Sequence, residues 1–333
     1  MIMGWRRFPA LACVFLVAAT TIAAAERSYT IAVVSKDKNN SWFVHMEKGI
    51  RQYGLDTGQN VFHTGPEGMY PDKQVEVVRD LVRQGVDALC VIPIDPVPLE
   101  PALKEAMDKG IVVICHEGTT VQNCHYDLEA FNNAEYGAFI MDNLARAMNG
   151  KGLYSTMVAH FTNTNHNAWA NGAIEQAESK YPGLTLFESM PQLESEDSIE
   201  TAYKRSKELL AASPDLKGII GTSSKDAPGI ARAIEELELV NKVFVSGTGM
   251  PNECRRSLKN GTLSYITLWD SALAGAALCS LAVKVIEGEP IENGLNLDIP
   301  GYDNLQFSKK SDRVLEGSGW MVIDASTVDD YDF

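Results

Sequence analysis

The sequence contains little of what disulfide-rich scaffolds, nucleic-acid-binding proteins and membrane proteins need. Six cysteines in 333 residues are too few for a fold held together by disulfides. Lys and Arg number 29 against 44 Asp and Glu, so the net charge is −15 and the surface should repel polyanions and anionic lipid. No apolar run after residue 25 is long enough to span a bilayer. We therefore expect no nucleic-acid partner and no direct membrane insertion.

The sequence also lacks the short motifs that mark common enzyme sites. It has no Walker loop, no Gly-x-Ser-x-Gly nucleophile elbow and no His-Glu-x-x-His pair. The Gly-Thr-Gly run at 247–249 follows a predicted strand, but Asn252 replaces the third glycine of a dinucleotide fingerprint, so we interpret it as a turn. His160 and His166 have no Cys or acidic residue at metal-ligand spacing. We expect no cofactor, no metal and no catalytic residue.

The first 25 residues have the pattern of an export signal. Trp5, Arg6 and Arg7 precede an apolar run at 8–25 that ends in three alanines, the small residues that a signal peptidase requires. An uncleaved membrane anchor is the alternative, but the run is short, rich in Ala and Thr, and stops at this cleavage-like site. We predict a soluble chain that is cleaved near Ala25 and exported.

Five cysteines remain after residue 25: Cys90, Cys115, Cys124, Cys254 and Cys279. Cys90 and Cys115 lie in apolar strand-like runs and Cys279 in an apolar helix, which is typical of small hydrophobic filler. An odd number leaves at least one thiol free or in an intermolecular bridge. We predict no disulfide framework, and a single bridge is the less favoured alternative.

Short β-branched runs alternate with amphipathic stretches along the chain, which is typical of parallel sheets covered on both faces. In the first half we expect strands at 29–35, 61–63, 88–92 and 112–115 and helices at 42–53, 71–84 and 98–109. After Asn132 we expect helices ending at 148 and spanning 167–180, 198–212, 227–237 and 253–260, with strands at 153–159, 184–187, 218–220, 243–246 and 263–268. The fold class is therefore α/β.

After Trp269 the pattern becomes uneven. A long apolar helix at 271–286 precedes a tail with Gly and Pro and little helical periodicity. Such a tail can return to the sheets as edge strands or crossovers, so two lobes need not be consecutive in sequence. Because no Pro- or Ser-rich linker is present, we expect several close strands to join the lobes and allow hinge bending.

Ligands of open α/β sheets bind beyond the carboxyl ends of the strands. The residues there combine amides, carboxylates, hydroxyls and a lysine with aromatic rings, which together can pair with neighbouring hydroxyls and cover an apolar C–H face. This favours a polyhydroxylated ligand, with ordinary polar surface loops as the alternative. The candidate ligand-binding residues are Lys36, Trp42, Phe43, His116, Glu117, Asn165, His166, Asn167, Thr222, Ser224 and Asp270.

Several segments in a fixed order carry a resemblance to a known family. They are Ile31-Ala32 through Lys36 to Trp42-Phe43, the run at 84–88, Leu268-Trp269-Asp270, the run at 297–301, and Tyr331-Asp332-Phe333. Over nearly the whole mature chain the sequence resembles type I periplasmic solute-binding proteins of the ribose and galactose superfamily. It is most similar to the branch that contains the autoinducer-2-binding and rhamnose-binding proteins of ABC importers.

The resemblance implies two Rossmann-like lobes, each a parallel sheet flanked by helices, joined by a three-segment hinge. Residues 26–131 plus about 271–304 would form the N-terminal lobe, and residues 132–270 plus about 305–333 the C-terminal lobe. The ligand would be enclosed when the lobes close, and the protein would act as a monomer.

The resemblance also implies roles for individual residues. Carried over by position, the binding lysine is Lys36 and the acid after the fourth strand is Glu117. The polar pair of the second lobe is Asn165 with His166, and the residues that approach the ligand closely after a later strand are Thr222 and Ser224. The acid beside the hinge tryptophan is Asp270. Trp42 or Phe43 would cover a carbon face, and Trp269 would serve hinge packing more than ligand stacking.

Two departures from the autoinducer-2 branch bear on the ligand. That branch has an acid and an amide where this chain has Asn165 and His166, and small apolar residues where it has Thr222 and Ser224. More neutral donors and acceptors suit a plainer sugar or polyol, so we expect a pentose, a deoxyhexose or a tetritol before autoinducer-2.

The predicted function is a periplasmic receptor that passes its ligand to an ABC permease and its ATPase. The first alternative keeps the cleft but presents the closed form, with autoinducer-2 or a sugar, to a sensor kinase or chemoreceptor. An exported glycoside hydrolase using Glu117 and Asp226 is a third, weaker possibility. An export signal in place of a DNA-binding helix pair excludes a transcriptional repressor.

Overall fold

The structure is a computed structural model that describes Met1 and residues 27–333. The predicted export signal at 1–25 lies outside the described residues, apart from Met1. The helices span α1 Ser41–Thr57, α2 Pro71–Gln84, α3 Pro96–Asp108, α4 Asn133–Ala147, α5 Thr164–Lys180, α6 Ile199–Ala212, α7 Asp226–Glu236, α8 Pro251–Lys259, α9 Ser271–Glu287 and the 3-10 turn η1 Val328–Asp330. The strands span β1 Thr30–Val34, β2 Asn60–Thr64, β3 Ala88–Val91, β4 Val112–Cys115, β5 Tyr126–Glu129, β6 Lys151–Val158, β7 Gly183–Leu186, β8 Gln192–Glu194, β9 Leu216–Gly221, β10 Phe244–Gly247, β11 Tyr265–Trp269, β12 Gln306–Phe307, β13 Val314–Glu316 and β14 Trp320–Asp324.

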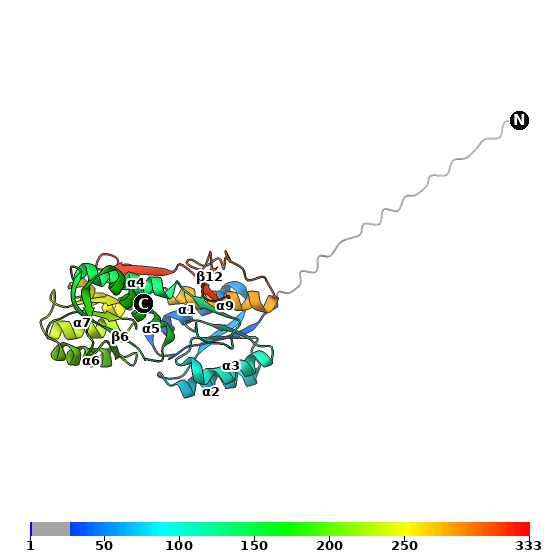
Figure 1. The fold of residues 1–333 in the computed structure, drawn as a ribbon. Helices are drawn as coiled ribbons and strands as arrows, with labels where there is room; N and C mark the ends of the chain where they lie inside the picture. The colour runs from blue at the N-terminus through cyan, green and yellow to red at the C-terminus, as the bar shows by residue number, and fades with distance from the viewer. Residues whose placement is uncertain (2–26) are drawn as a thin grey trace.

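The first lobe is a seven-stranded sheet with helices on both faces. Its strand order is β12-β13-β5-β4-β3-β1-β2, and β1 to β5 are parallel. Alternate side chains of β1 point to opposite faces: Ile31 and Val33 pack with α1 and α9, while Ala32 and Val34 pack with α2 and α3. Figure 1 shows these helix pairs on opposite faces of the sheet. Both faces are buried, which explains why these strands read as continuous apolar runs.

The second lobe repeats this architecture around a parallel sheet in the order β10-β9-β6-β7, with β8 also paired to β6. Helices α4 and α5 pack against each other, as do α6 and α7. The separate ribbon of β11 and β14 is antiparallel and is joined to the end of β10 by a bridge between Thr248 and Thr267. The two lobes lie side by side (Figure 1), so the predicted two-lobed α/β fold is confirmed.

Helix boundaries follow local signals in the sequence. Helix α2 starts with Pro71 at its first turn and ends before Gly85, which adopts φ 73° and caps the helix in the left-handed region. Helices α1 and α9 approach closely because Gly49 and Gly275 lack side chains: a Cβ on Gly49 would collide with the backbone of Ala272. This contact holds α9 on the first lobe although it follows the second lobe in sequence.

The tail after α9 departs from the expected lobe assignment. Strand β13 pairs in parallel with β5, and β12 pairs with β13, so residues 306–316 extend the first sheet and not the second lobe. The expectation that the chain joins the second lobe at about residue 305 is therefore wrong. The chain returns to it only at β14, which pairs with β11. The reason is that the apolar Val314 and Leu315 complete the uncovered edge of β5.

Three crossings connect the lobes: residues 130–132 between β5 and α4, Asp270 between β11 and α9, and residues 317–319 between β13 and β14. The first and third crossings lie side by side, since the amides of Gly317 and Gly319 donate to the carbonyls of Glu129 and Ala130 at 3.0 and 2.8 Å. A Cβ on Gly317 would lie 2.4 Å from the carbonyl oxygen of Gly301, so glycine is required there.

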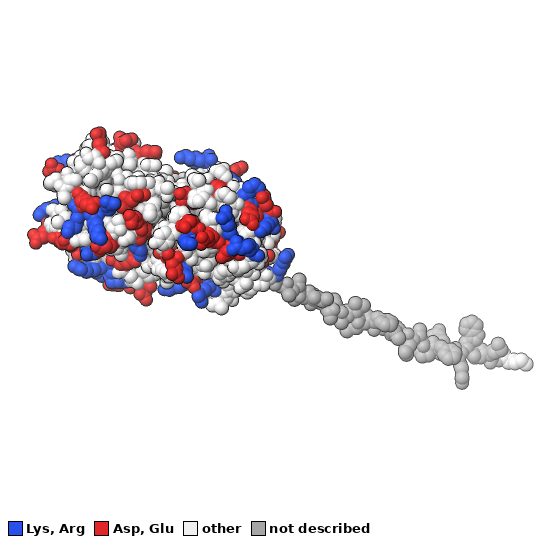
Figure 2. Space-filling model, turned by 90° about the horizontal axis from the view of Figure 1, so that it is seen from below, with Lys and Arg blue, Asp and Glu red and all other residues white. Residues whose placement is uncertain are grey.

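Charge is distributed without a dominant basic patch on the face seen in Figure 2, where Lys and Arg are interspersed with Asp and Glu. Among the residues that the structure describes, none of the helices is long and apolar enough to cross a membrane.

Candidate functional site

A cavity lies between the two lobes, with about 380 Å³ of empty space when the part open to solvent is included. Its first-lobe wall comes from the end of β1, the start of α1 and the loop after β4, and its second-lobe wall from the ends of β6 and β9 and the start of α5. It is lined by Lys36, Asn40, Trp42, Phe43, Met69, Glu117, Ala159, Asn163, His166, Trp169, Asp197, Thr222, Ser224, Thr248 and Trp269. The cavity therefore occupies the carboxyl ends of the strands of both sheets.

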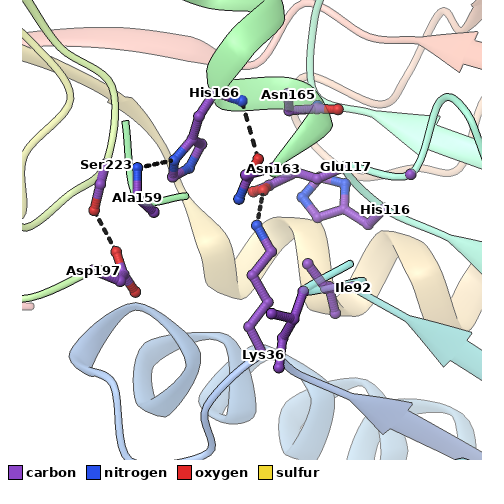
Figure 3. A network of polar contacts seen from close by, with 12 residues as sticks. Lys36, Ile92, His116, Glu117, Ala159, Asn163, Asn165, His166, Asp197 and Ser223 are labelled. Atoms are coloured by element: carbon purple, nitrogen blue, oxygen red, sulfur yellow. Dashed lines mark hydrogen bonds and ion pairs between the residues drawn. The ribbon is translucent and has the colours of Figure 1, made fainter. Parts of the chain in front are cut away.

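The first-lobe wall centres on an ion pair. Lys36 extends from the end of β1 and its Nζ donates to the carboxylate of Glu117, with both side chains 5% exposed (Figure 3). Burial alone would raise the pKa of Glu117, but the charge and hydrogen bond of Lys36 outweigh burial and hold it below its ordinary value. Glu117 also has φ 55°, an unusual backbone conformation for a residue other than glycine that recurs at binding sites. The pair therefore offers a charged donor and a charged acceptor to the cavity, although its net charge is zero.

The second-lobe wall is neutral at its centre. The backbone N–H of Ala159 donates to Nδ1 of His166 at 3.2 Å, so the ring proton lies on Nε2. Burial, helped by the nearby charge of Lys36, lowers the pKa of His166 to about 3 and keeps the ring uncharged. Asn163 caps α5 by accepting the N–H of His166 at 3.1 Å through Oδ1. Its amide nitrogen is buried and has no partner among the described residues.

Hydroxyls and a carboxylate complete the second-lobe wall. Thr222 follows β9 and donates through Oγ1 to the carbonyl of Met157 at 3.0 Å, which leaves the hydroxyl oxygen as an acceptor. Ser224 lies beside it and also lines the cavity. Asp197 has φ 51° and accepts hydrogen bonds from the Ser223 hydroxyl of its own lobe and from Asn40 Nδ2 of the other lobe, the latter at 2.6 Å.

Aromatic rings form the apolar part of the cavity. Trp42 and Trp269 meet edge to face with centroids 4.5 Å apart, and Trp169 lies 5.5 Å from Trp269. The indole N–H groups of Trp42 and Trp269 are buried without a partner in the described part of the chain. Trp269 also packs edge to face on Phe131 of the first hinge segment, with centroids 5.1 Å apart. It therefore lines the cavity as well as packing at the hinge.

Seven of the eleven candidate residues come together in the cavity lining: Lys36, Trp42, Phe43, Glu117, His166, Thr222 and Ser224. Four lie outside the lining. Asn167 donates into the first turn of its own helix, to the carbonyl of Asn163 at 2.6 Å. Asp270 caps α9 through the N–H of Ala272 and contacts His45 at 3.0 Å. These two side chains are occupied by structural contacts.

His116 and Asn165 lie just behind the lining and lead to two acids that sequence reasoning missed. His116 donates from Nδ1 to the carbonyl of Leu128 at 2.5 Å, and Asn165 donates to Glu129 at 2.6 Å. Glu129 and Asp127 lie on β5 with the same orientation and are buried. Burial and the neighbouring carboxyl of Asp127 raise the pKa of Glu129 well above its ordinary value. The bond between Asn165 and Glu129 joins the lobes.

Other contacts join the lobes across the mouth of the cavity. Ser41, at the start of α1, donates to Glu253 of α8 and accepts from Lys225, the residue before α7, both at 2.7 Å. Thr120 and Thr164 meet at 3.2 Å. Together with the bond between Asn40 and Asp197, these contacts show that the lobes are closed on each other in this structure.

Five lining residues outside the candidate set had a sequence signal, because each belongs to a polar or aromatic stretch at the end of a strand: Asn40, Asn163, Trp169, Thr248 and Trp269. Met69 and Asp197 had none. They follow the edge strands β2 and β8, and β8 is only three residues long.

The carboxylate pair of Glu117 and Asp226, which the glycoside-hydrolase alternative needs, does not face one cavity in the structure. Asp226 does not line the cavity that Glu117 lines; it accepts the N–H of Ser223 at 2.8 Å, and burial raises its pKa to about 7. No group of three His, Cys, Asp or Glu residues in the described segments could hold a metal ion. The site is built for hydrogen bonding.

Residues 31–290 match the family model described as periplasmic binding protein domain. The chain belongs to this family. The ribose import binding protein of Bacillus subtilis is 23% identical to this periplasmic binding protein over 284 residues, covering 81% of this chain and 86% of the relative. The D-allose-binding periplasmic protein of Escherichia coli is 27% identical over 281 residues, covering 80% of this chain and 86% of the relative.

Solved structures share the fold over almost the entire length. LsrB from Clostridium saccharobutylicum in complex with AI-2 has a TM-score of 0.83 at 23% identity, covering 91% of this chain and all of that chain. An ABC transporter solute-binding protein from Clostridium phytofermentas with bound L-rhamnose has a TM-score of 0.82 at 19% identity, covering 92% and 98%. These likenesses confirm the predicted fold, and the family model confirms the predicted resemblance to periplasmic binding proteins.

Proposed function

We propose that this periplasmic binding protein captures one small, uncharged, polyhydroxylated molecule between its lobes, a pentose, a deoxyhexose or a tetritol. The observation that carries the proposal is the pairing of Lys36 with Glu117 opposite a second-lobe wall whose centre, formed by His166 and Asn163, is uncharged. An anion would compete with Glu117 for Lys36, and a cation would compete with Lys36 for Glu117. A ligand with hydroxyl groups can donate to one and accept from the other without disturbing the pair.

The unpartnered N–H groups support the same class of ligand. Trp42, Trp269 and Asn163 each keep a buried donor without a partner among the described residues, and leaving such a donor unsatisfied costs roughly 1–3 kcal/mol. Hydroxyl oxygens can accept from these donors while the indole rings cover a C–H face.

The proposal extends to export and delivery. The apolar run at 8–25 supports export to the periplasm, and the related proteins include ribose import binding proteins. The protein would act as a monomer and hand its ligand to an ABC permease driven by an ATPase. Presentation of the closed form to a sensor kinase or chemoreceptor would use the same lobe surfaces.

Isothermal titration calorimetry tests the ligand class. The protein is first unfolded and refolded by dialysis to remove any bound molecule. It is then titrated with pentoses, deoxyhexoses, tetritols and autoinducer-2, each paired where possible with its aldonic acid as an anionic control. We expect saturable 1:1 binding of at least one neutral compound and much weaker binding of its acid. No detectable binding of any neutral compound, or tighter binding of an aldonic acid than of its neutral partner, would contradict the proposal.

A further inference from the structure

Two buried acids lie at the boundary between the lobes, behind the lining of the cavity. Asp127 and Glu129 are two residues apart on β5, so their side chains lie on the same face of the sheet. They are 1% and 2% exposed. Among the described residues no Lys or Arg forms an ion pair with either acid, because the buried Lys36 is paired with Glu117. Two neighbouring buried carboxylates without a cation are costly, which favours the protonation of one of them.

The second lobe contacts these acids through one amide group. Nδ2 of Asn165, on α5, donates to Oε2 of Glu129 at 2.6 Å and to Oδ1 of Asn133 on α4 at 3.3 Å. Both hydrogens of the amide are therefore used, and the side chain of Asn165 is buried. Because Glu129 belongs to the first lobe and α4 and α5 belong to the second, the bond between Asn165 and Glu129 depends on how the lobes lie relative to each other.

The polar atoms around Glu129 include more acceptors than donors. Oε1 of Glu129, Oδ2 of Asp127 and Oδ1 of Asn165 are buried without a partner among the described residues. All three are acceptors when the carboxyls are ionised, so none of them can satisfy another. The hydroxyl of Tyr302, which also has no partner in the described part of the chain, offers one donor for three acceptors. A proton on Glu129 turns one of these acceptors into a donor and so supplies a hydrogen bond that the group lacks.

The charges that face the two acids favour the same proton. The other titratable groups around them are Glu117 with Lys36, His116, Glu316 and Tyr302. Lys36 cancels the charge of Glu117, and Glu316 is half-buried and accepts from Asn132 at 3.1 Å. Helix α5 contributes the neutral amide of Asn165. Burial and Asp127 together raise the pKa of Glu129 well above its ordinary value, in agreement with the count of donors.

We propose that Glu129 is a positioning residue that holds the lobes closed as a neutral acid, so that closing the cleft takes up one proton. When the cleft opens, Asn165 leaves Glu129, water reaches the carboxyl, and the carboxyl ionises. When the cleft closes, an O–H bond forms at Oε1 of Glu129 with a proton from a buffer acid, whose conjugate base stays in solution. The inference rests on the proposed function, because closing over a sugar is the binding step.

Proton uptake makes sugar binding depend on pH. Between the ordinary pKa of a glutamate and the raised pKa of Glu129 in the closed form, the open form is ionised and the closed form is neutral. Each rise of one pH unit in this window should therefore lower the affinity for the sugar by up to about tenfold. A purely structural role of Glu129 would not produce this dependence.

Calorimetry in two buffers counts the proton. Each pentose, deoxyhexose or tetritol that binds in the panel above is titrated at the same near-neutral pH in phosphate and in Tris, whose heats of ionisation differ strongly. The difference between the two binding enthalpies, divided by the difference between the two heats of ionisation, gives the number of protons taken up. We expect about one proton for the wild type, as the full drop from an ionised to a neutral Glu129 requires.

Two variants assign the proton to Glu129. Glu129→Gln reproduces the neutral acid, so we expect it to bind the sugar without proton uptake and with an affinity that no longer changes with pH. Asp127→Asn offers its own amide N–H to the acceptors beside Glu129, so we expect a smaller uptake than in the wild type. Glu316→Gln changes the half-buried acid opposite Glu129 in the register and should keep the wild-type uptake. No uptake by the wild type, or equal uptake by the wild type and Glu129→Gln, would overturn the inference.

Small-angle X-ray scattering tests the coupling without a sugar. Between pH 5 and pH 9 we expect the radius of gyration of the unliganded wild type to grow as the lobes open, while Glu129→Gln stays compact. If no compound of the panel binds, the proposed function fails and scattering alone decides this inference. Expansion confined to the wild type would then support it, and identical curves for the two proteins would overturn it. Failure of the proposed function is therefore distinguishable from failure of the proton coupling.

Discussion

The two walls of the cavity have the same origin in the fold but different chemistry. Each is built at the carboxyl ends of a parallel sheet and includes an asparagine that caps a helix: Asn40 for α1 and Asn163 for α5. The first-lobe wall places the pair of Lys36 and Glu117 beside its cap. The second-lobe wall places the uncharged His166 beside its cap. We infer that the first wall anchors the ligand by charge-assisted hydrogen bonds and the second selects it by neutral ones.

The largest effect should follow from breaking the charged wall. Lys36→Met leaves the buried Glu117 without its partner, so we expect sugar affinity to fall more than ~100-fold and the free energy of unfolding to drop by about 3 kcal/mol. Calorimetry and urea denaturation measure the two. Lys38→Met is the matched control, because Lys38 pairs with Glu67 at the surface, with side chains 41% and 72% exposed. If Lys38→Met is as damaging as Lys36→Met, the anchoring role is wrong.

The two capping asparagines allow a matched comparison, because serine caps a helix equally well. Asn163→Ser keeps the cap of α5 but removes the buried amide N–H that has no partner among the described residues. We expect a roughly 5- to 100-fold loss of affinity for the sugar, corresponding to one lost buried hydrogen bond, with an unchanged melting temperature. An unchanged affinity would show that this amide does not contact the ligand.

Asn40→Ser should reduce sugar affinity less than Asn163→Ser, because it weakens closure of the lobes and not a contact with the sugar. It keeps the cap of α1 but removes the 2.6 Å bond to Asp197 across the mouth of the cavity. The closed form then loses one interlobe contact, so we expect a roughly 3- to 10-fold loss of affinity and a larger radius of gyration of the unliganded protein in small-angle X-ray scattering. The neighbouring Asn39→Ser is the control. Equal scattering of Asn40→Ser and the control would argue against a closing role for Asn40.

The smallest effect concerns the pH dependence of stability. Burial and Asp127 raise the pKa of Glu129 in the folded state, so this group stabilises the fold below the ordinary pKa and loses that contribution as pH rises through the raised value. Glu117 behaves oppositely, since its lowered pKa gives stability that is lost as pH falls through the folded value. The other groups near Glu129 are Asn165 and the hydroxyl of Tyr302.

Glu129→Gln should therefore flatten the fall in stability on the alkaline side, where one group contributes at most ~1.4 kcal/mol per pH unit. Urea denaturation of wild type and variant between pH 5 and pH 9 measures this slope. Glu47→Gln, which alters a partly exposed acid with a lowered pKa, is the control. Identical slopes for wild type and Glu129→Gln would show that Glu129 is ionised in the fold.

The sequence predicts the regular elements well where local chemistry decides them. Helix α2 was predicted with its observed bounds because Pro71 and Gly85 mark its ends. Strand β5 was missed because its sequence, Tyr-Asp-Leu-Glu, reads as a polar segment; its acids are buried only through tertiary contacts. Strands β12 and β13 were assigned to the wrong lobe because the edge of a distant strand, β5, determines their position.

In the candidate site, too, the sequence predicts residues placed by local signals and misses residues placed by tertiary contacts. Lys36, Glu117 and His166 were predicted because each follows a strand or begins a helix at the expected edge of a sheet. Asp270 was expected in the site but caps α9, a role that a carboxylate before an apolar helix can equally fill. Glu129 and Asp197 depend on contacts between the lobes, which the order of residues along the chain does not specify.

A crystal structure of the protein with the sugar that binds best in calorimetry tests the central claim most directly. The account predicts one sugar molecule between the lobes, with one hydroxyl within hydrogen-bonding distance of both Lys36 and Glu117 and another on Asn163 or His166. Electron density for the sugar at any other place, or a cavity that holds only water at saturating sugar, would contradict the account.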